Sequence, residues 1–209
     1  MKWLIAAAAT VALGVYLGRR VAAAEAVPDD MPDQLPNAIE SFANDLIQMP
    51  YLLPNVSVNE AQNLRAFLDM IAFAEGTAGE NGYYVMFGGG LMTSLADHPR
   101  RLFTFTNLAG QQLRTTAAGR YQFLARTWDT LKARLGLPDF GPASQDAAAI
   151  ELIRERGALP DVYAGRLTTA ITKVATIWAS LPGAGYNQPE RKLTSLATAY
   201  QAAGGNFEA

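Results

Sequence analysis

The stretch that most constrains this chain is a predicted helix whose apolar face ends in an acid. Leu64, Leu68, Ile71 and Glu75 recur at spacings of four, three and four residues, which places all of them on one helix face. Gly76 follows, and glycine is the residue that most often ends a helix. The carboxyl of Glu75 therefore continues the apolar stripe, where burial and the negative end of the helix dipole both raise its pKa.

Two interpretations of Glu75 are open from this pattern. A carboxylic acid that stays protonated near neutral pH is what general-acid cleavage of a glycoside requires. The alternative is a side chain that bends out to solvent at the helix end, because Glu is almost never buried without a partner. The motifs further along the chain favour the catalytic interpretation.

Composition excludes several classes of protein. The 209 residues, half of them hydrophobic and with a net charge of -2, indicate one globular domain with extra sequence at one end. The absence of a basic excess argues against nucleic acid as a partner. The chain has no cysteine, which excludes disulfides, thiolate metal sites and a Cys nucleophile. Its one histidine, His98, cannot form a multi-histidine metal site. No metal or other cofactor is expected.

The first segment, residues 1–26, contains an apolar run from 3 to 18 with Lys2 before it and two arginines after it. A cleaved signal peptide is one interpretation, with small residues at 22, 24 and 26 that offer an A-x-A cleavage site. An uncleaved inner-membrane anchor is the second, because the charge on both sides leaves the orientation undecided. A buried core helix is the third.

The second segment, residues 27–59, reads as a tether because it has prolines at 28, 32, 36, 50 and 54. Asn37 could cap a short helix inside it, whose shared face is formed by Ile39, Phe42, Leu46 and Ile47. That helix would dock on the domain or lie at a membrane surface. The alternative is a packed extension of the domain that follows, residues 60–209.

The pattern in residues 60–209 predicts an α+β fold. Apolar runs bounded by turn signals predict strands at 83–87 and 101–105. Apolar stripes predict helices over 121–135, 148–153, 167–178 and 193–200, with glycines or a proline at their ends. A small sheet inserted after the first helix implies two lobes with a ligand cleft between them. The triplet Gly88-Gly89-Gly90 lacks the Gly-Lys-Ser/Thr of a phosphate loop.

Several motifs follow one another in an order that points to one family. They are Phe-Leu-Asp-Met-Ile-Ala-Phe-Ala-Glu-Gly-Thr at 67–77, Ala-Asp-His-Pro-Arg at 96–100, Ala-Gly-Arg-Tyr-Gln at 118–122, Glu-Arg-Gly-Ala-Leu-Pro at 155–160, and Trp-Ala-Ser-Leu-Pro-Gly-Ala-Gly-Tyr-Asn-Gln at 178–188. Together they closely resemble the endolysin family of phage lambda, over about residues 63 to 206. The resemblance implies a lysozyme-like fold and a lytic transglycosylase that cuts peptidoglycan. It does not extend to the amino-terminal region.

The resemblance implies that Glu75 is the catalytic carboxylate. In the family a single Glu protonates the oxygen between N-acetylmuramic acid and N-acetylglucosamine, and then accepts the proton of the muramic acid 6-hydroxyl. That hydroxyl closes on the anomeric carbon and leaves a 1,6-anhydro sugar, so no water is consumed. Because the nucleophile is already tethered to the substrate, no second carboxylate is needed, whereas a hydrolase would need one.

The expected substrate-binding residues lie in three of the motifs: Asp97, His98, Gly119, Arg120, Tyr121, Gln122, Tyr186 and Gln188. Asp97 is also the best candidate for the second carboxylate of a hydrolase, with a salt bridge to Arg100 or a hydrogen bond to His98 as the structural alternative. His98 is expected to have a structural or sugar-contacting role. The segment from Gly119 to Gln122 is expected to begin the helix that lines the sugar cleft, or else to place Tyr121 in the core.

Two other functions remain open from the sequence. One is a true muramidase of the same fold, and the other is a non-catalytic glycan-binding or virion structural protein. The expected partners are peptidoglycan glycan strands and the inner membrane, with virion components as an alternative, and the catalytic domain is expected to be monomeric. The expected location is the cell envelope, with residues 1–26 cleaved, retained, or released like the signal-arrest-release segments of some phage endolysins.

Overall fold

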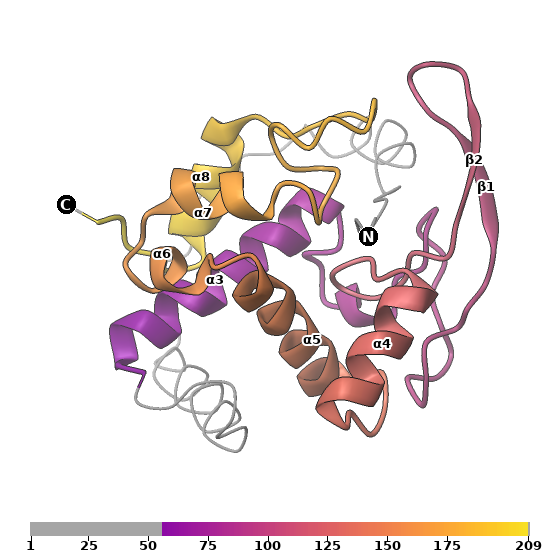
Figure 1. Cartoon of the computed structure of the whole chain (residues 1–209), viewed down its shortest axis with the longest axis horizontal. Coiled ribbons are helices and arrows are strands. Elements are labelled where there is room, and N and C mark those ends of the chain that lie inside the picture. Colours follow the sequence, from indigo (N-terminus) through magenta and orange to yellow (C-terminus); the bar gives the residue numbers. More distant parts are fainter. Residues whose placement is uncertain (1–55, 209) are drawn as a thin grey trace, which may run out of the picture.

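The computed structural model describes residues 56–208, which form an α+β domain around helix α3, Val58–Glu75 (Figure 1). At its start the Ser57 hydroxyl accepts the backbone N–H of Glu60, and the Glu60 carboxylate accepts the Ser57 N–H. This reciprocal pair is a capping box, which fixes where the helix begins. Gly76 ends the helix with φ 76°. The predicted helix and its end are therefore confirmed.

The predictions for the segment 1–26 and for the short helix expected around 37–47 lie outside the described residues. The tether prediction ran to residue 59, but α3 already begins at Val58. Within the described part of the chain, we find no helix with the length and hydropathy needed to cross a bilayer.

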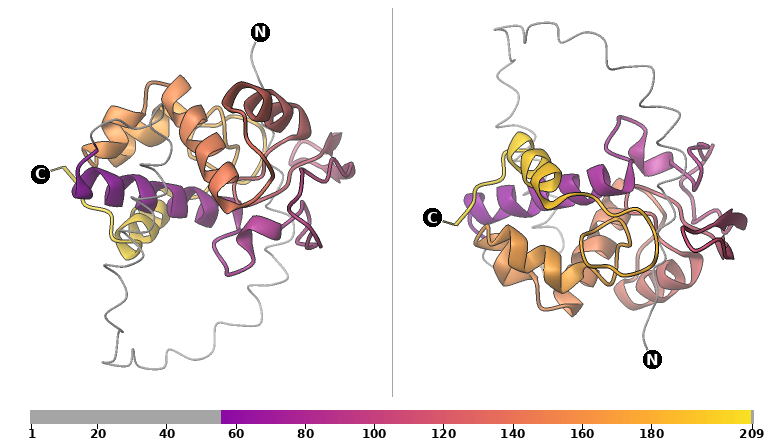
Figure 2. Two further views of the ribbon diagram at one scale, coloured as in Figure 1. Left: turned by 90° about the horizontal axis from the view of Figure 1, so that it is seen from below. Right: turned by 90° about the horizontal axis from the view of Figure 1, so that it is seen from above.

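The remaining elements follow α3 in the order η2 Gly82–Tyr84, β1 Phe103–Thr106, β2 Gln112–Thr115, α4 Ala125–Leu135, α5 Pro142–Glu155, α6 Leu159–Tyr163, α7 Leu167–Val174 and α8 Leu193–Ala202. Helix α3 packs along α8 and α6. Figure 2 shows α3 running through the middle of the domain, with the β1–β2 hairpin beyond one end and α6, α7 and α8 gathered toward the other. The carboxyl end of α3 therefore points toward the hairpin side of the molecule.

The core forms where the apolar face of α3 meets the later helices. Phe67 and Ile71 of α3 are fully buried, and so are the large rings of Trp128, Phe140 and Trp178. The Trp128 and Phe140 rings meet edge to face with their centroids 4.5 Å apart, which is a favourable aromatic geometry. Because this core surrounds α3 along most of its length, Glu75 at its end lies at the rim of the core.

The sheet is a single antiparallel hairpin in which Phe103 of β1 faces Thr115 of β2. The predicted strand at 101–105 is confirmed with its start shifted to Phe103. Strand β2 was not predicted. Its side chains are exposed except at Thr115, so it shows no alternation of apolar and polar residues.

The prediction of a strand at 83–87 is wrong. Residues Gly82–Tyr84 form a short 3-10 helix, and then Val85 makes a single bridge with Leu91. Gly88 and Gly89 have φ values of 83° and 88°, so the chain turns back before a longer ladder can form.

Two predicted helix boundaries also change. Helix α4 starts at Ala125 instead of 121, because Gly119 and Gln122 both adopt positive φ and form a turn ahead of it. Helix α7 ends at Val174, and Trp178 follows a tighter turn in which the Ile177 N–H donates to the Val174 carbonyl. The predicted stops at 136 and 157 are confirmed, since both glycines have positive φ. The five-residue helix α6 was too short to show a stripe.

Candidate active site

Glu75 occupies the last position of α3 and is 1% exposed. The Ser180 hydroxyl donates a hydrogen bond of 2.5 Å to Oε1 of Glu75. The other oxygen, Oε2, is buried and has no hydrogen-bond partner among the described residues. Because Ser180 acts as the donor, the proton of the neutral carboxyl belongs on Oε2, which is the oxygen left free to deliver it.

Burial raises the pKa of Glu75 to about 7, while the Ser180 hydrogen bond and the positive charge of Arg191 act in the opposite direction. Desolvation is the dominant cause, because taking a carboxylate out of water favours its neutral form. The raised pKa expected from the sequence is therefore found. At neutral pH this carboxyl can both give and take a proton, which is what acid–base catalysis needs.

Folding stability should reflect this buried acid. The folded-state pKa of Glu75 is raised above its ordinary value, so its contribution to stability is fully present below pH 4.5 and is lost as pH rises through about 7. We expect Glu75→Gln to match wild type at pH 4.5 and to exceed it at pH 8 by about 3 kcal/mol. Urea unfolding of both proteins between pH 4 and pH 9 measures this difference. A difference that stays constant with pH would show that Glu75 titrates normally.

Asp97 lies in a charged cluster at the surface, beside α4. Its carboxylate pairs with Arg100 at 2.7 Å and with Lys132 at 3.1 Å, and it accepts a hydrogen bond from the Trp128 indole at 3.1 Å. These donors hold the pKa of Asp97 well below its usual range, with the Arg100 hydrogen bond the largest cause. The groups that act on Glu75 are Ser180 and Arg191, and neither belongs to this cluster. The structure thus gives Asp97 the salt-bridge role that the sequence left as its alternative.

His98 is 2% exposed and is held by hydrogen bonds on both ring nitrogens. Nδ1 accepts the backbone N–H of Arg100 at 3.0 Å, so Nε2 carries the proton and donates it to the Phe123 carbonyl at 2.9 Å. Burial lowers the pKa of the imidazole, which keeps it neutral. His98 therefore ties the 96–100 segment to the chain ahead of α4.

The segment from Gly119 to Gln122 is a turn instead of the expected start of a helix. Gly119 has φ 80°, and a Cβ at this position would lie 2.3 Å from the side-chain oxygen of Gln145. The Gly119 backbone is thus pressed against the protein interior. Tyr121 is 1% exposed and its hydroxyl donates to Asp146 at 2.7 Å. Gln122 is equally buried and donates to the Gly119 carbonyl at 2.9 Å.

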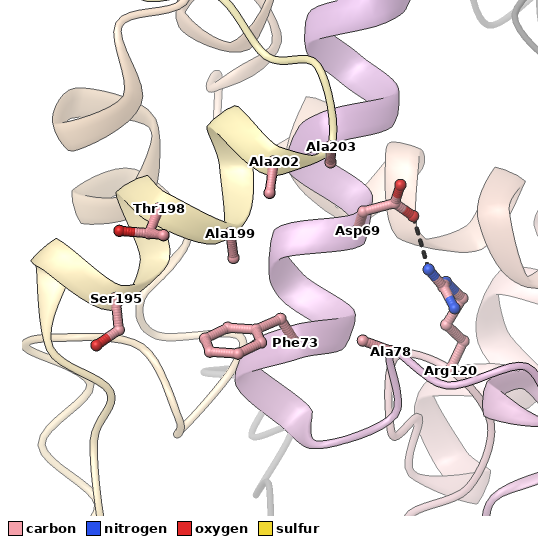
Figure 3. A pocket seen from close by; sticks show the side chains of 9 residues that line it. All are labelled: Asp69, Phe73, Ala78, Arg120, Ser195, Thr198, Ala199, Ala202 and Ala203. Atoms are coloured by element: carbon pink, nitrogen blue, oxygen red, sulfur yellow. Dashed lines mark hydrogen bonds and ion pairs between the residues drawn. The ribbon is translucent and has the colours of Figure 1, made fainter. Parts of the chain in front are cut away.

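Arg120 is the member of this turn that reaches a groove. It pairs with Asp69 of α3 at 2.6 Å and lies over the Tyr83 ring. Figure 3 shows this ion pair on one wall of a groove of about 610 Å³, with Phe73 of α3 and the alanines of α8 forming other parts of it. Asp69 and Tyr83 therefore hold the guanidinium in place, and its charge is paired with the Asp69 carboxylate on the same wall. The residues that line this groove do not include Glu75.

Tyr186 and Gln188 lie in the loop between α7 and α8, and both are partly exposed. The Tyr186 hydroxyl donates to the Thr176 carbonyl at 2.7 Å. The next residue, Asn187, has φ 54°, and its carbonyl accepts the N–H of Leu108 from the tip of the β1–β2 hairpin at 3.1 Å. This contact joins the loop between α7 and α8 to the β1–β2 hairpin, which are far apart in the sequence (Figure 1).

Two residues of the site were missed by sequence reasoning. Ser180 was part of a motif but was not singled out, and Arg191 carried no signal, because both lie in a loop where no periodicity marks the inward side. Both act directly on Glu75. Within residues 56–208, we find no cluster of three or more His, Cys, Asp or Glu side chains that could hold a metal ion.

Comparison with known proteins gives consistent matches. A family model described as Endolysin matches residues 65–207. The endolysin of Escherichia phage lambda is 49% identical over 147 residues, which cover 68% of this chain and 90% of that protein. The endolysin of Escherichia phage P2 is 47% identical over 161 residues, which cover 71% of this chain and 96% of that protein.

The solved structures agree with the sequence matches. The lysozyme of bacteriophage lambda in complex with a chitohexasaccharide has a TM-score of 0.67 and 45% identity, covering 75% of this chain and all of that one. A second lambda lysozyme structure has a TM-score of 0.63 and 44% identity over the same shares. The lysozyme-like α+β fold predicted from the sequence is thereby confirmed.

Proposed function

The chain belongs to the Endolysin family, and we propose that it is a lytic transglycosylase that cleaves the β-1,4 bond between N-acetylmuramic acid and N-acetylglucosamine. Peptidoglycan cleavage as such follows from its relatives, which are endolysins and a phage lysozyme. The finer claim concerns the reaction. The observation that carries it is the buried carboxyl of Glu75 at the end of α3, which has a pKa near neutrality and accepts a hydrogen bond from Ser180.

In the proposed first step, Glu75 gives the proton on Oε2 to the bridging oxygen. The bond from that oxygen to the anomeric carbon breaks, and N-acetylglucosamine leaves with a free 4-hydroxyl. Glu75 is now a carboxylate. In the second step it accepts the proton of the muramic acid 6-hydroxyl while that oxygen bonds to the anomeric carbon. The anhydro ring closes and Glu75 regains its starting form, so protons balance without water.

One carboxyl is sufficient for this sequence because the same group acts first as acid and then as base. A hydrolase would instead need a second carboxylate roughly 5 to 9.5 Å away to act on water or on the sugar. Asp97, the candidate for that role, is committed to Arg100, Lys132 and Trp128. Among the described residues, the charged side chain that acts on Glu75 is Arg191, which is a cation and not a second carboxylate.

We also propose which residues contact the glycan. Arg120, Tyr186 and Gln188 keep partly exposed side chains beside the groove or on the loop between α7 and α8, so they are suited to hydrogen-bond or stack on sugars. Of the other expected contacts, His98, Tyr121 and Gln122 are buried in hydrogen bonds within the protein, and the partly exposed Asp97 is ion-paired with Arg100 and Lys132. Their contribution would be to hold the segments around α4 and α5 together.

Replacing Asp97 tests the proposal against the hydrolase. We expect Asp97→Asn to keep cleavage of purified peptidoglycan within about threefold of wild type and to lose about 1 kcal/mol of stability, because it weakens a partly exposed ion-pair cluster. Glu75→Gln is the matched control that loses cleavage. If Asp97→Asn stays folded by circular dichroism yet is as inactive as Glu75→Gln, the one-carboxyl mechanism is wrong.

The amino-terminal segment is proposed to bring this domain to the cell envelope. Its apolar run would insert in the inner membrane, and the enzyme would then act on the wall either anchored or released. Fractionation of cells that make the full chain with a carboxy-terminal tag, followed by intact mass, distinguishes the routes. Loss of about 24 to 26 residues indicates cleavage at the A-x-A site, and full-length protein in the membrane pellet indicates an anchor. Full-length protein in the cytosol would contradict the proposal.

A further inference from the structure

Arg191 lies directly ahead of α8, and its side chain packs against the last turn of α3. Its Nε donates to the Ala74 carbonyl at 3.3 Å, and its guanidinium lies 5.3 Å from the centroid of the Phe73 ring. Cations favour such positions over aromatic faces. The two residues that fix the guanidinium are therefore the two that immediately precede Glu75.

Arg191 acts electrostatically on Glu75 but does not form an ion pair with its carboxyl. Within residues 56–208, no ion pair joins Arg191 and Glu75. Each of the two side chains still influences the ionisation of the other. Its contacts with Ala74 and Phe73 hold the positive charge beside the carboxyl and out of direct contact with it.

The backbone of Arg191 fixes a second group of the site. Its N–H donates to the Ser180 carbonyl at 2.7 Å, and the Ser180 hydroxyl donates to Glu75. The neighbouring acid, Glu190, is committed to the same loop, because its carboxylate accepts the N–H groups of Gly183 and Gly185. The loop between α7 and α8 thus places the Ser180 hydroxyl and the Arg191 cation near Glu75, while the carboxylate of Glu190 is hydrogen-bonded within the loop.

We propose that Arg191 is a positioning residue that holds a positive charge near Glu75 without neutralising it, so that the carboxyl can exist in both of its protonation states during one reaction. This inference rests on the proposed function, in which Glu75 is first an acid and then a base. A direct ion pair would keep Glu75 ionised and remove the proton needed for the first step. Without the cation, the carboxylate formed after that step would be a buried charge with no nearby positive charge to stabilise it.

The test compares three variants of the full chain with wild type. Arg191→Gln removes the charge, Arg191→Lys keeps it, and Lys192→Gln removes the charge of the adjacent residue as a matched control. For each protein we would measure kcat and KM for peptidoglycan cleavage from pH 5 to pH 9. Each of these proteins is also compared with the same protein carrying Glu75→Gln. The difference in unfolding free energy within each pair, measured against pH, reports the titration of Glu75 independently of activity.

We expect Arg191→Gln to move the alkaline limb of the kcat profile to higher pH by about half a pH unit or more. It should also lower kcat about tenfold with little change in KM. Arg191→Lys should restore the position of the limb, and Lys192→Gln should leave it unchanged. A limb that stays in place in folded Arg191→Gln, or that moves equally in Lys192→Gln, would overturn the proposal. Neither result depends on whether the product is an anhydro sugar, so this failure is distinct from a failure of the proposed function.

Discussion

Glu75→Gln is expected to abolish peptidoglycan cleavage, with a loss of at least about 10²- to 10⁴-fold, the contribution typical of a general acid and base. The amide keeps an oxygen that can accept the Ser180 hydrogen bond, so the local packing of the site is retained. It has no acidic proton to give, and it is too weak a base to accept one. Turbidity loss of purified cell walls at pH 6 measures the effect.

Folding of the variant must be checked in parallel. Because a neutral amide removes the cost of a buried charge, Glu75→Gln should unfold at a temperature no lower than that of wild type at pH 7. It should also still bind cell walls in a pelleting assay. Cleavage within a few-fold of wild type in this folded variant would remove Glu75 from the mechanism.

Gly119→Ala is expected to destabilise the fold strongly, with a loss of about 3 kcal/mol or more. The residue has φ 80°, which penalises any side chain. In addition, the new Cβ would lie 2.3 Å from the Gln145 side-chain oxygen and 2.8 Å from the Phe140 ring. Thermal and urea unfolding measure the loss.

Gly110→Ala, in the hairpin turn, is the matched control. It has a similar φ of 76°, but a methyl group at this position would meet nothing within 4 Å, so only the backbone cost of about 1 kcal/mol applies. If Gly119→Ala is as stable as Gly110→Ala but binds glycan poorly, then Gly119 serves close approach of a sugar instead of internal packing.

The periodicity of apolar residues predicts the long helices, because each of them buries one face. Helix α3 follows from the spacing of its apolar residues, and the ends of α4 and α5 follow from the glycines after them. The missed elements lack such a face: β2 is almost wholly exposed, and α6 is only five residues long. The strand wrongly predicted at 83–87 has the right composition, but the following glycines turn it away from a partner.

The same reasoning explains what could be predicted of the site. Glu75 lies on a periodic helix, so its inward direction could be read from its spacing to Ile71. Its partners Ser180 and Arg191 come from a loop, whose course depends on backbone hydrogen bonds across the fold. Tyr121 and Gln122 are predicted from the sequence to contact substrate, but both are buried in a turn where Gln122 has positive φ, a conformation that residue types alone do not reveal.

The central claim is that the muramic acid 6-hydroxyl, and not water, attacks the anomeric carbon. Digestion of purified peptidoglycan in water enriched in oxygen-18, followed by mass spectrometry of the released muropeptides, tests it directly. We predict new ends that are one water lighter than reducing ends and that carry no heavy oxygen. Reducing ends labelled with oxygen-18 would show hydrolysis, and would contradict the one-carboxyl mechanism proposed for Glu75.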